Sequence, residues 1–354
     1  MNARYRCICF ALPSRLLRRI AEKAGGEDRA RLLDHIEHSS QLRGARASKA
    51  AEVAARPGAS AHPSLDWHRS VFDSHGTKSL PGSPVRVEGG EPAVDVAVNQ
   101  AYDNVGITLE FFAKVFSRKS LDNRAMRVDS SVHYGKGFVN AMWTGKEMLF
   151  GDGDGTNILG FSQSLDIVAH ELSHGVTQHA IAGGLGEVHM NGRTELKGQA
   201  GALNESLSDV FATMAKQWHA KQSVAQANWL LGEGILAPHL GKAIRSLKDP
   251  GNPAHTYEDD DQARDMSGYV ADGDVHANSG IPNHAFYLAA TSMGGHSWER
   301  AGAIWYEAMH KLSSQASFAD AARDTVAAAS RLFGEASGEK RAVSAAWQRV
   351  KVIK

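Results

Sequence analysis

Two histidines four residues apart, in a stretch whose apolar residues recur at helical spacing, constrain this chain more than any other feature. The stretch is His-Glu-Leu-Ser-His at residues 170–174. On a helix, residues i and i+4 lie on one face about a turn apart, so two imidazoles at this spacing can grip one tetrahedral cation. We therefore predict a helix over residues 165–180, with an apolar face made by Leu165, Ile167, Val168, Leu172 and Val176.

A downstream segment supplies the groups that such a site still needs. A catalytic zinc usually takes three protein ligands and leaves one position for water. Glu205 can join His170 and His174 as the third ligand. Asp209 lies one helical turn beyond Glu205 and can accept the remaining ring N–H of a ligand histidine, which fixes its orientation. Asn204 can do the same for the other histidine.

The two histidines could also be a chance match or part of a structural zinc site. The pentapeptide alone is weak evidence, because the chain holds 17 histidines and two of them can match by chance on the surface. A purely structural zinc site is closed by four protein ligands, mostly cysteine and histidine, which this set does not provide. The downstream glutamate and aspartate favour an open, catalytic site.

Length and charge set broader limits. The chain has 354 residues, enough for about two domains with a sizeable core. Lysine plus arginine and aspartate plus glutamate both total 39, so nothing suggests a nucleic-acid partner. No apolar run approaches the length of a membrane span. Cys7 and Cys9 are the only cysteines, which excludes a disulfide framework.

The pattern of residue types changes along the chain. Residues 4–50 look like a small helical appendage, and Pro and Gly mark a linker at 54–63. The appendage has apolar residues at helical spacing: Leu16, Leu17, Ile20, Leu32, Leu33 and Ile36. Strand-like segments follow at 126–129 and 137–143. Helical patterns then occupy 165–180, 200–218, 281–293, 298–313 and 317–333. We predict an α+β protein of two lobes, with the histidine helix between them.

The N-terminus does not read as a secretory signal peptide. Its apolar stretch ends early at Pro13, and Arg15, Arg18 and Arg19 follow in place of a small-residue cleavage site. We expect synthesis in the cytoplasm, with any export to the outside by a route that the sequence does not reveal.

These motifs, and several others in the same order, resemble the thermolysin family of gluzincin metallopeptidases. Within it the chain is most similar to the protealysin-like branch, whose members carry a short propeptide. The resemblance covers residues 67–354, with matching pieces at 140–143, 151–155, 166–178, 201–209, 229–234, 245–250 and 275–281. It implies a zinc-dependent endopeptidase with one Zn²⁺. It also implies a propeptide and linker at 1–60, a β-rich lobe with the zinc helix at 61–183, and a helical lobe at 184–354.

The resemblance also assigns catalytic roles. Glu171 would be the general base that takes a proton from the zinc-bound water and passes it to the leaving amine. His276 would stabilise the oxyanion of the tetrahedral intermediate. The family's aspartate five residues before this histidine is replaced by Ala271, so Asp272 or Asp274 would have to orient His276.

A second departure from the family pattern concerns a tyrosine near the oxyanion. Its position falls on Leu196, which cannot donate a hydrogen bond, at the end of a longer segment than the family usually has. Losing one such donor typically costs about 2.7–4 kcal/mol of transition-state stabilisation. We expect either a slower reaction or a substitute donor from the inserted segment, such as His189.

Substrate-binding residues follow from the same resemblance. Asn140 and Ala141 resemble the residues that hold the substrate backbone, so an extended peptide would add alongside this strand. Arg245 resembles the arginine that holds the carbonyl next to the scissile bond. The pocket for the residue after the cut would be lined by Ile158, Phe161, Ile167, Leu231, Ile235 and Ile244. All six are apolar, which implies cleavage on the N-terminal side of bulky hydrophobic residues.

Calcium at the paired site of the family is not expected. Asp166 and Glu233 match two of its ligands, but the other positions hold Lys216, Asn228 and Leu230. Calcium takes several oxygen ligands, and an ammonium group cannot be one of them. We expect the Lys216 ammonium to bridge Asp166 and Glu233 in place of the metal.

The appendage resembles the start of a protealysin-type propeptide, although Leu12-Pro13-Ser14 matches the family pattern only in part. It would cover the cleft as an intramolecular inhibitor until proteolysis in the linker, between Gly44 and Trp67, removes it. Cys7 and Cys9 are either small buried hydrophobes or, less in keeping with their type, a thiolate that reaches the zinc.

The leading hypothesis is a self-processed endopeptidase precursor that acts on peptides and proteins as a monomer, with no nucleic-acid or membrane partner. The alternative is a catalytically weakened zinc protein that binds peptides, motivated by Leu196 and Ala271. An activity assay on processed protein distinguishes the two.

Overall fold

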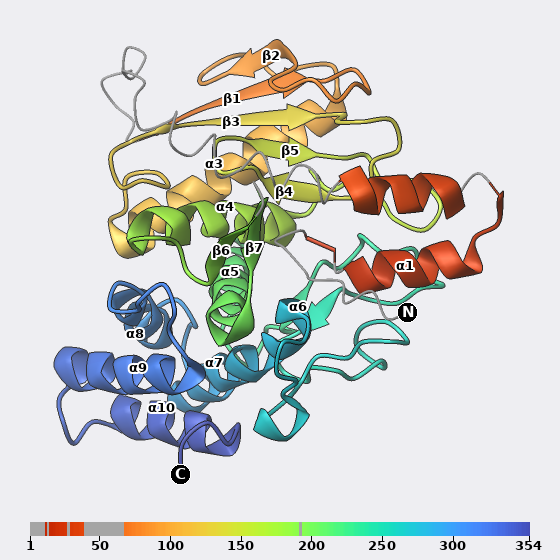
Figure 1. Cartoon of the computed structure of the whole chain (residues 1–354). Coiled ribbons are helices and arrows are strands. Elements are labelled where there is room, and N and C mark those ends of the chain that lie inside the picture. The colour runs from red at the N-terminus through yellow and green to blue at the C-terminus, as the bar shows by residue number, and fades with distance from the viewer. Residues whose placement is uncertain (1–10, 13, 27–28, 39–66, 191–192) are drawn as a thin grey trace.

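The computed structural model describes residues 11–12, 14–26, 29–38, 67–190 and 193–354. In these ranges, five strands form a mixed sheet in the order β2-β1-β3-β5-β4 (Figure 1). They are β1 (His68–Asp73), β2 (Ser83–Val87), β3 (Arg127–Val132), β4 (Ala141–Trp143) and β5 (Met148–Phe150). β1 with β3 and β3 with β5 pair in parallel, whereas β2 and β4 run antiparallel to their neighbours. The two ends of the sheet are therefore β2 and β4.

A long helix, α3 (Val96–Phe116), packs on this sheet and is an addition to the helices expected from the sequence. Its apolar residues recur at 98, 102, 105, 109 and 112, which is helical spacing. Asp95 caps its first turn by accepting the N–H of Val98 at 3.1 Å. The helix ends at Ser117, whose φ is 53°.

The second lobe is helical, as predicted. Its helices are α5 (Gly198–His219), α6 (Val275–Asn278), α7 (Gly280–Met293), α8 (Arg300–Met309), α9 (Phe318–Phe333) and α10 (Gly338–Arg349), with the 3-10 turn η1 (Met266–Gly268). The helix α4 (Leu165–Ala180) joins the two lobes, so the α+β, two-lobed architecture is confirmed. The last helix, α10, is an addition to the expected set.

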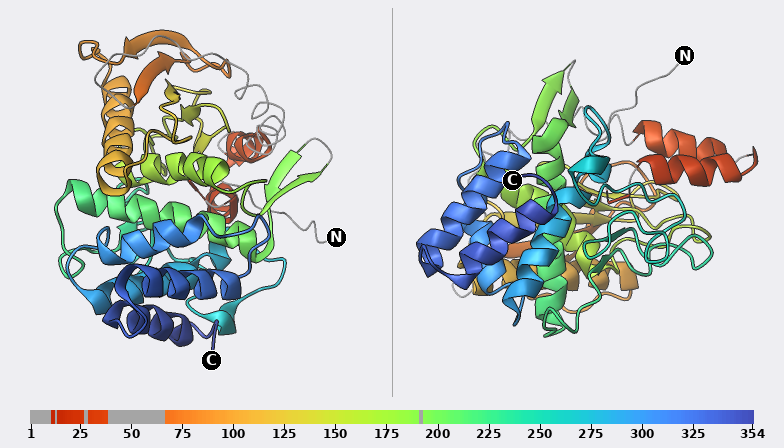
Figure 2. Two further views of the ribbon diagram at one scale, coloured as in Figure 1. Left: turned by 90° about the vertical axis from the view of Figure 1, so that its left-hand side faces the viewer. Right: turned by 90° about the horizontal axis from the view of Figure 1, so that it is seen from below.

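Two small hairpins interrupt the helical lobe. β8 (Leu230–Leu231) pairs with β9 (Arg245–Ser246). β6 (Glu187–Met190) pairs with β7 (Arg193–Leu196) and projects from the body (Figure 2). The inserted segment after α4 is therefore a hairpin that leads directly into α5.

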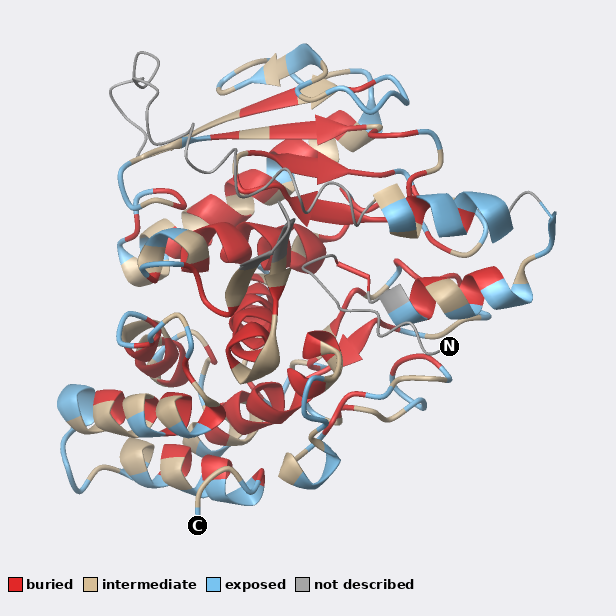
Figure 3. Ribbon diagram, in the orientation of Figure 1, coloured by how far each residue is buried: buried red, intermediate tan, exposed pale blue. Residues whose placement is uncertain are grey.

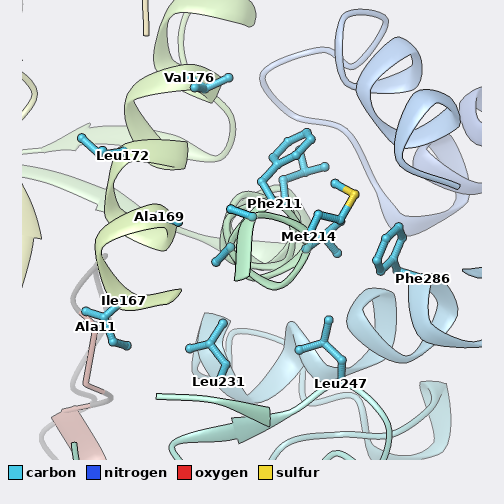
Figure 4. Packing of buried hydrophobic residues seen from close by; sticks show 14 of the residues in the cluster. Ala11, Ile167, Ala169, Leu172, Val176, Phe211, Met214, Leu231, Leu247 and Phe286 are labelled. Atoms are coloured by element: carbon cyan, nitrogen blue, oxygen red, sulfur yellow. The ribbon is translucent and has the colours of Figure 1, made fainter. Parts of the chain in front are cut away.

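The core is centred on α4 and α5, which are buried along most of their length (Figure 3). They make the most extensive contact between any two elements of the described chain. In Figure 4, Leu172 and Val176 of α4 and Phe211 and Met214 of α5 belong to one apolar cluster that reaches both lobes. The two histidines thus lie in the interior, as the apolar face of their helix predicts.

The appendage forms two helices that lie side by side against the body (Figures 1 and 2). They are α1 (Ser14–Lys23) and a helix at 29–38. Leu16, Leu17 and Ile20 are buried on α1, as expected. On the second helix Leu32 is buried but Leu33 is 46% exposed, which corrects its assignment to the apolar face. The linker at 54–63 and both cysteines lie outside the described residues. In the part of the chain that is described, no helix combines the length and apolar character of a membrane span.

Gly175 sets how closely α4 approaches β4, and replacing it tests that packing. A Cβ on Gly175 would lie 2.8 Å from Leu121 Cδ1 and 3.2 Å from Trp143 Cε2. We predict that Gly175→Ala lowers the free energy of unfolding by about 1–3 kcal/mol through overpacking, measured by urea denaturation. The control Gly338→Ala adds a Cβ whose nearest neighbour is an Arg341 side chain at 3.9 Å, and should change stability by less than about 0.5 kcal/mol. Equal stability of the two variants would contradict this account.

Candidate active site

His170 and His174 on α4 face Glu205 on α5, and the three side chains are fully buried. In the described part of the chain, they are the one group of three such residues whose ligand atoms all lie within 4.8 Å of one another. The Nε2 atoms of the two histidines are 3.1 Å apart. Glu205 Oε2 lies 3.4 Å from Nε2 of His170 and 3.8 Å from Nε2 of His174.

This geometry fits a tetrahedral zinc ion. Zinc–nitrogen bonds of about 2.0–2.1 Å place two ligand nitrogens about 3.3 Å apart, close to the spacing of the two imidazoles. Both oxygens of Glu205 are buried and lack a hydrogen-bond donor among the described residues. A buried carboxylate is costly unless a cation or donors compensate it, and a divalent ion at this point would do so.

Each histidine is oriented through its other ring nitrogen. Asp209 Oδ1 lies 2.8 Å from Nδ1 of His170. Asn204 Oδ1 lies 2.9 Å from Nδ1 of His174, and Ser208 Oγ lies 3.0 Å from the same atom. Both expected pairings are therefore present, and Ser208 is an additional contact that the sequence did not single out. Such partners fix the rotation of a ligand histidine and leave Nε2 for the metal.

The site is strongly polarised. Burial tends to raise the pKa of Glu205, but the facing histidines outweigh it and hold that pKa far below the ordinary value. Burial tends to lower the pKa of His170, yet the nearby carboxylates of Asp209 and Glu205 raise it to about 9. The negative charge of the site thus lies on α5, and the side chains that face α5 supply positive charge.

The two candidate catalytic residues, Glu171 and His276, come from different elements. Glu171, fully buried on α4, follows His170 in the chain and accepts the backbone N–H of Trp143 in β4 at 2.9 Å. His276 on α6 places Nε2 at 3.2 Å from Glu205 Oε2. His276 therefore borders the metal-binding group.

Asp274 takes the place of the aspartate that is missing at Ala271. Its Oδ1 lies 3.1 Å from Nδ1 of His276 and also accepts the backbone N–H of His276 at 2.8 Å. Asp274 is at the same time the N-cap residue of α6. Of the two substitutes expected, Asp274 orients the ring, and Asp272 occupies a turn position with φ 56°.

A peptide segment of the chain itself lies along β4. The N–H of Ala11 donates to the carbonyl of Ala141 at 3.4 Å, and the N–H of Leu12 donates to Asn140 Oδ1 at 3.2 Å. Arg245 Nη1 donates to the carbonyl of Ala11 at 3.4 Å. The three residues expected to hold a substrate backbone therefore hold the appendage.

The six residues expected to line the apolar pocket belong to the same buried cluster as Ala11. They are Ile158, Phe161, Ile167, Leu231, Ile235 and Ile244, and all are fully buried. Ala11 is itself fully buried, and Figure 4 draws it next to Ile167 at the start of α4.

The first helix of the appendage is held by ion pairs to a loop of the helical lobe. Arg15 pairs with Asp261, Arg19 with Asp259 at 2.8 Å, and Lys23 with Glu258 at 3.1 Å. The three cations recur every four residues and so lie on one face of α1. The acidic run 258–261 is thus the surface on which α1 rests.

Asn283 is a buried polar residue that the sequence reasoning missed. Asp209 Oδ1 faces both His170 and Arg245, whose Nη2 lies 2.9 Å away, while Asp209 Oδ2 accepts the Nδ2–H of Asn283 at 2.8 Å. Asn283 lies on α7, in a different helix from His276, so no local spacing in the sequence signals its contact with Asp209. It links α7 to the carboxylate that orients a zinc ligand.

Leu196 is buried at the end of β7. A Cβ on Gly201 would lie 2.9 Å from the Leu196 carbonyl carbon and 2.9 Å from Val275 Cγ1, so Leu196 is close to the residue before His276. The backbone of His189 pairs with Thr194 in the hairpin, but its side chain lies outside the described part of the structure.

Lys216 lies between Asp166 and Glu233. Its Nζ donates to Asp166 Oδ2 at 3.0 Å, to Glu233 Oε2 at 2.8 Å and to the carbonyl of Leu230 at 3.0 Å. The expected bridge is therefore present. Asn228 adds an amide N–H to Glu233 Oε2 at 2.8 Å.

Comparisons with known proteins agree with this geometry. Residues 81–178 match the model for the thermolysin metallopeptidase catalytic domain, and residues 193–352 match that for the thermolysin metallopeptidase α-helical domain. An extracellular metalloprotease of Pectobacterium carotovorum subsp. carotovorum is 39% identical over 362 residues, which covers 98% of this chain and 97% of that protein. Thermolysin of Alicyclobacillus acidocaldarius subsp. acidocaldarius is 33% identical over 297 residues, 80% of this chain and 50% of that protein.

A solved structure gives the same result for the whole chain, appendage included. It is the precursor of protealysin, a metalloproteinase from Serratia proteamaculans, with a TM-score of 0.83 and 40% identity over 98% of this chain and 100% of that one. The chain therefore belongs to the thermolysin family of zinc metallopeptidases and is protealysin-like.

Proposed function

We propose that the chain is a self-processed precursor of a zinc endopeptidase that cuts on the N-terminal side of bulky hydrophobic residues. One observation carries the proposal. The backbone of Ala11 and Leu12 is held by Asn140, Ala141 and Arg245 beside the convergent metal-binding group. A peptide in this position has its carbonyls next to the groups that would hydrolyse them.

The mechanism assigns one task to each polar group. His170, His174 and Glu205 would hold zinc, which lowers the pKa of a bound water and polarises the scissile carbonyl. Glu171 takes the proton from the attacking water and delivers it to the leaving amine. His276, held by Asp274, donates to the oxyanion as it develops. Arg245 holds the neighbouring carbonyl and so fixes the register of the peptide.

The preference for bulky residues rests on the apolar pocket. The six residues that line it carry no side-chain polar atom that could favour a charged substrate group, and burying a large aliphatic or aromatic side chain contributes about 1.5–3 kcal/mol. In the precursor this region is covered by Ala11, which is small. A substrate with Leu or Phe in that place gains more apolar burial than the propeptide does.

The appendage acts in this proposal as an intramolecular inhibitor. It comprises residues 1–60 with its linker, ahead of the lobes at 61–183 and 184–354, and its removal requires a cut between Gly44 and Trp67. It occupies the backbone donors and acceptors of the cleft, so a substrate cannot bind until it leaves. The name of the Pectobacterium relative supports an extracellular site of action for the mature enzyme.

The alternative, a weakened protein that mainly binds peptides, has one observation in its favour. Leu196 is buried where the family pattern has a hydroxyl donor, so the oxyanion loses one partner. The second motive, Ala271, is offset by the contact between Asp274 and His276. Zinc binding without peptide hydrolysis by the processed protein would favour this alternative.

The central prediction concerns Glu171. Purified precursor should shorten by about 45–65 residues, a range set by the linker boundaries, and then cleave an internally quenched peptide before a central Leu or Phe. Glu171→Gln keeps the size of the side chain but removes the base, so we expect zinc to stay bound and both activities to fall at least about a hundredfold. Mass spectrometry, zinc content and fluorescence follow the three quantities. A Glu171→Gln protein that still processes itself would refute the mechanism.

A second prediction tests Asn283 as a positioning residue. Asn283→Ala removes the donor of Asp209 Oδ2, and we expect zinc affinity to fall by about 10–100-fold in competition with a chelator. Asn283→Asp has the same shape but faces one carboxylate with another, so its loss should be larger. The urea midpoint of the metal-free proteins reports any general damage to the fold. Unchanged zinc affinity in both variants would remove Asn283 from this role.

A third prediction concerns calcium. We propose that Lys216 replaces the metal, so millimolar calcium should not change the thermal midpoint of the wild-type precursor. Lys216→Met leaves Asp166, which is 4% exposed, without its cation. We expect a loss of about 2 kcal/mol, less than for a fully buried pair because Glu233 is partly in water. Calcium bound to the wild type, or a calcium-dependent midpoint that Lys216→Met abolishes, would contradict this proposal.

A further inference from the structure

The second helix of the appendage docks on the β-rich lobe through a buried histidine. His35 is 5% exposed, and its ring meets the edge of Phe138 with centroids 5.6 Å apart. Its Nδ1 is buried and has no hydrogen-bond partner among the described residues. Leu32, one turn earlier, is buried on the same face. A protonated ring at this position would bury a charge, and no described residue would receive its Nδ1–H.

A second histidine of the same helix is in a different state. His38 stacks on Tyr134 with ring centroids 5.9 Å apart, and its Nε2 lies 2.8 Å from the Tyr134 hydroxyl. It is only half-buried. His38 therefore keeps a partner and access to water, whereas Nδ1 of His35 has neither among the described residues. Protonation of His35 should therefore weaken docking more than protonation of His38.

The charges around His35 come from both sides of the interface. Asp34 on the same helix pairs with Lys78 of the catalytic part at 3.6 Å. Arg31 also lies on the helix, with its Cδ 3.7 Å from the Cβ position of Gly137. Burial is the main cause that lowers the pKa of His35; Asp34 opposes it, and Arg31, Lys78 and His38 lower it further. On the side of the lobe, burial, with a smaller contribution from Glu147, raises the pKa of Tyr134 to about 12, so the tyrosine stays neutral.

We propose that His35 makes the docking of residues 29–38 acid-labile, so that a fall in pH loosens the propeptide and starts processing. Docking and release need no peptidase activity, and only the processing that follows rests on the function proposed above. The pH-sensitive element is the contact between His35 and Phe138, which weakens when His35 is protonated.

The direction follows from proton binding. Burial lowers the pKa of His35 from its ordinary 6.5 to about 4 when the helix is docked. The undocked ring regains the ordinary value and therefore binds protons more tightly. Docking is at full strength above pH 6.5, weakens as the pH falls below that value, and loses no more below about pH 4. In this window the docking constant falls by up to roughly tenfold per pH unit.

The test uses full-length precursor carrying Glu171→Gln, which cannot process itself. Hydrogen exchange of amides in residues 29–38 is measured between pH 5.5 and 7.5, with amides of α10 as the internal reference for intrinsic exchange. We expect protection of 29–38 to fall about fivefold to tenfold from pH 6.5 to 5.5, relative to α10. His35→Phe keeps an aromatic ring that cannot titrate, and its protection should not change with pH.

Two further variants make the outcome unambiguous. His35→Gln is neutral and polar, and should also lose the pH dependence even where it docks less tightly. His38→Gln should lower protection at every pH but keep the slope of the parent. The proposal is overturned by a flat profile in the parent, or by the same slope in the parent and in both His35 variants. Near-ultraviolet circular dichroism verifies that each variant retains the native fold.

Discussion

The structure depends on two buried carboxylates of α5, Glu205 and Asp209. Neither can stay charged inside a protein unless cations and hydrogen-bond donors face it. α4 supplies two imidazoles, β9 supplies Arg245 and α7 supplies Asn283, so elements far apart in the chain are arranged around one helix. A zinc ion at the junction of His170, His174 and Glu205 would complete the compensation. Buried carboxylates would destabilise an ordinary core, but here they are the groups that would hold and orient the metal site.

The same donors serve the precursor and the enzyme. Arg245 pairs with Asp209 on one side and holds the carbonyl of Ala11 on the other, so the residue that would fix a substrate is part of the network that orients His170. Under the proposed function, the propeptide would inhibit through the same backbone contacts that hold a substrate. Substrate and propeptide would then differ in what they present to zinc and to the apolar pocket.

The sequence predicted what depends on short spacing. The pair of histidines one turn apart identified α4, and the buried acidic pattern of α5 identified the third ligand and the orienting residues. The sequence did not reveal contacts between distant segments. Asn283 meets Asp209 only because α7 crosses α5. For His276 the sequence left two candidate partners, Asp272 and Asp274, and the contact is made by Asp274. Helix α3 was not predicted, although its apolar residues recur at helical spacing.

The two helices of the propeptide rest on different lobes. α1 is paired with the acidic loop at 258–261 of the helical lobe, and residues 29–38 pack on Tyr134 and Phe138 of the β-rich lobe. A hinge motion that opened the cleft would have to break one of these two anchorages. The propeptide thus connects the two lobes to each other. Under the proposed function, its removal would free the lobes to move relative to one another.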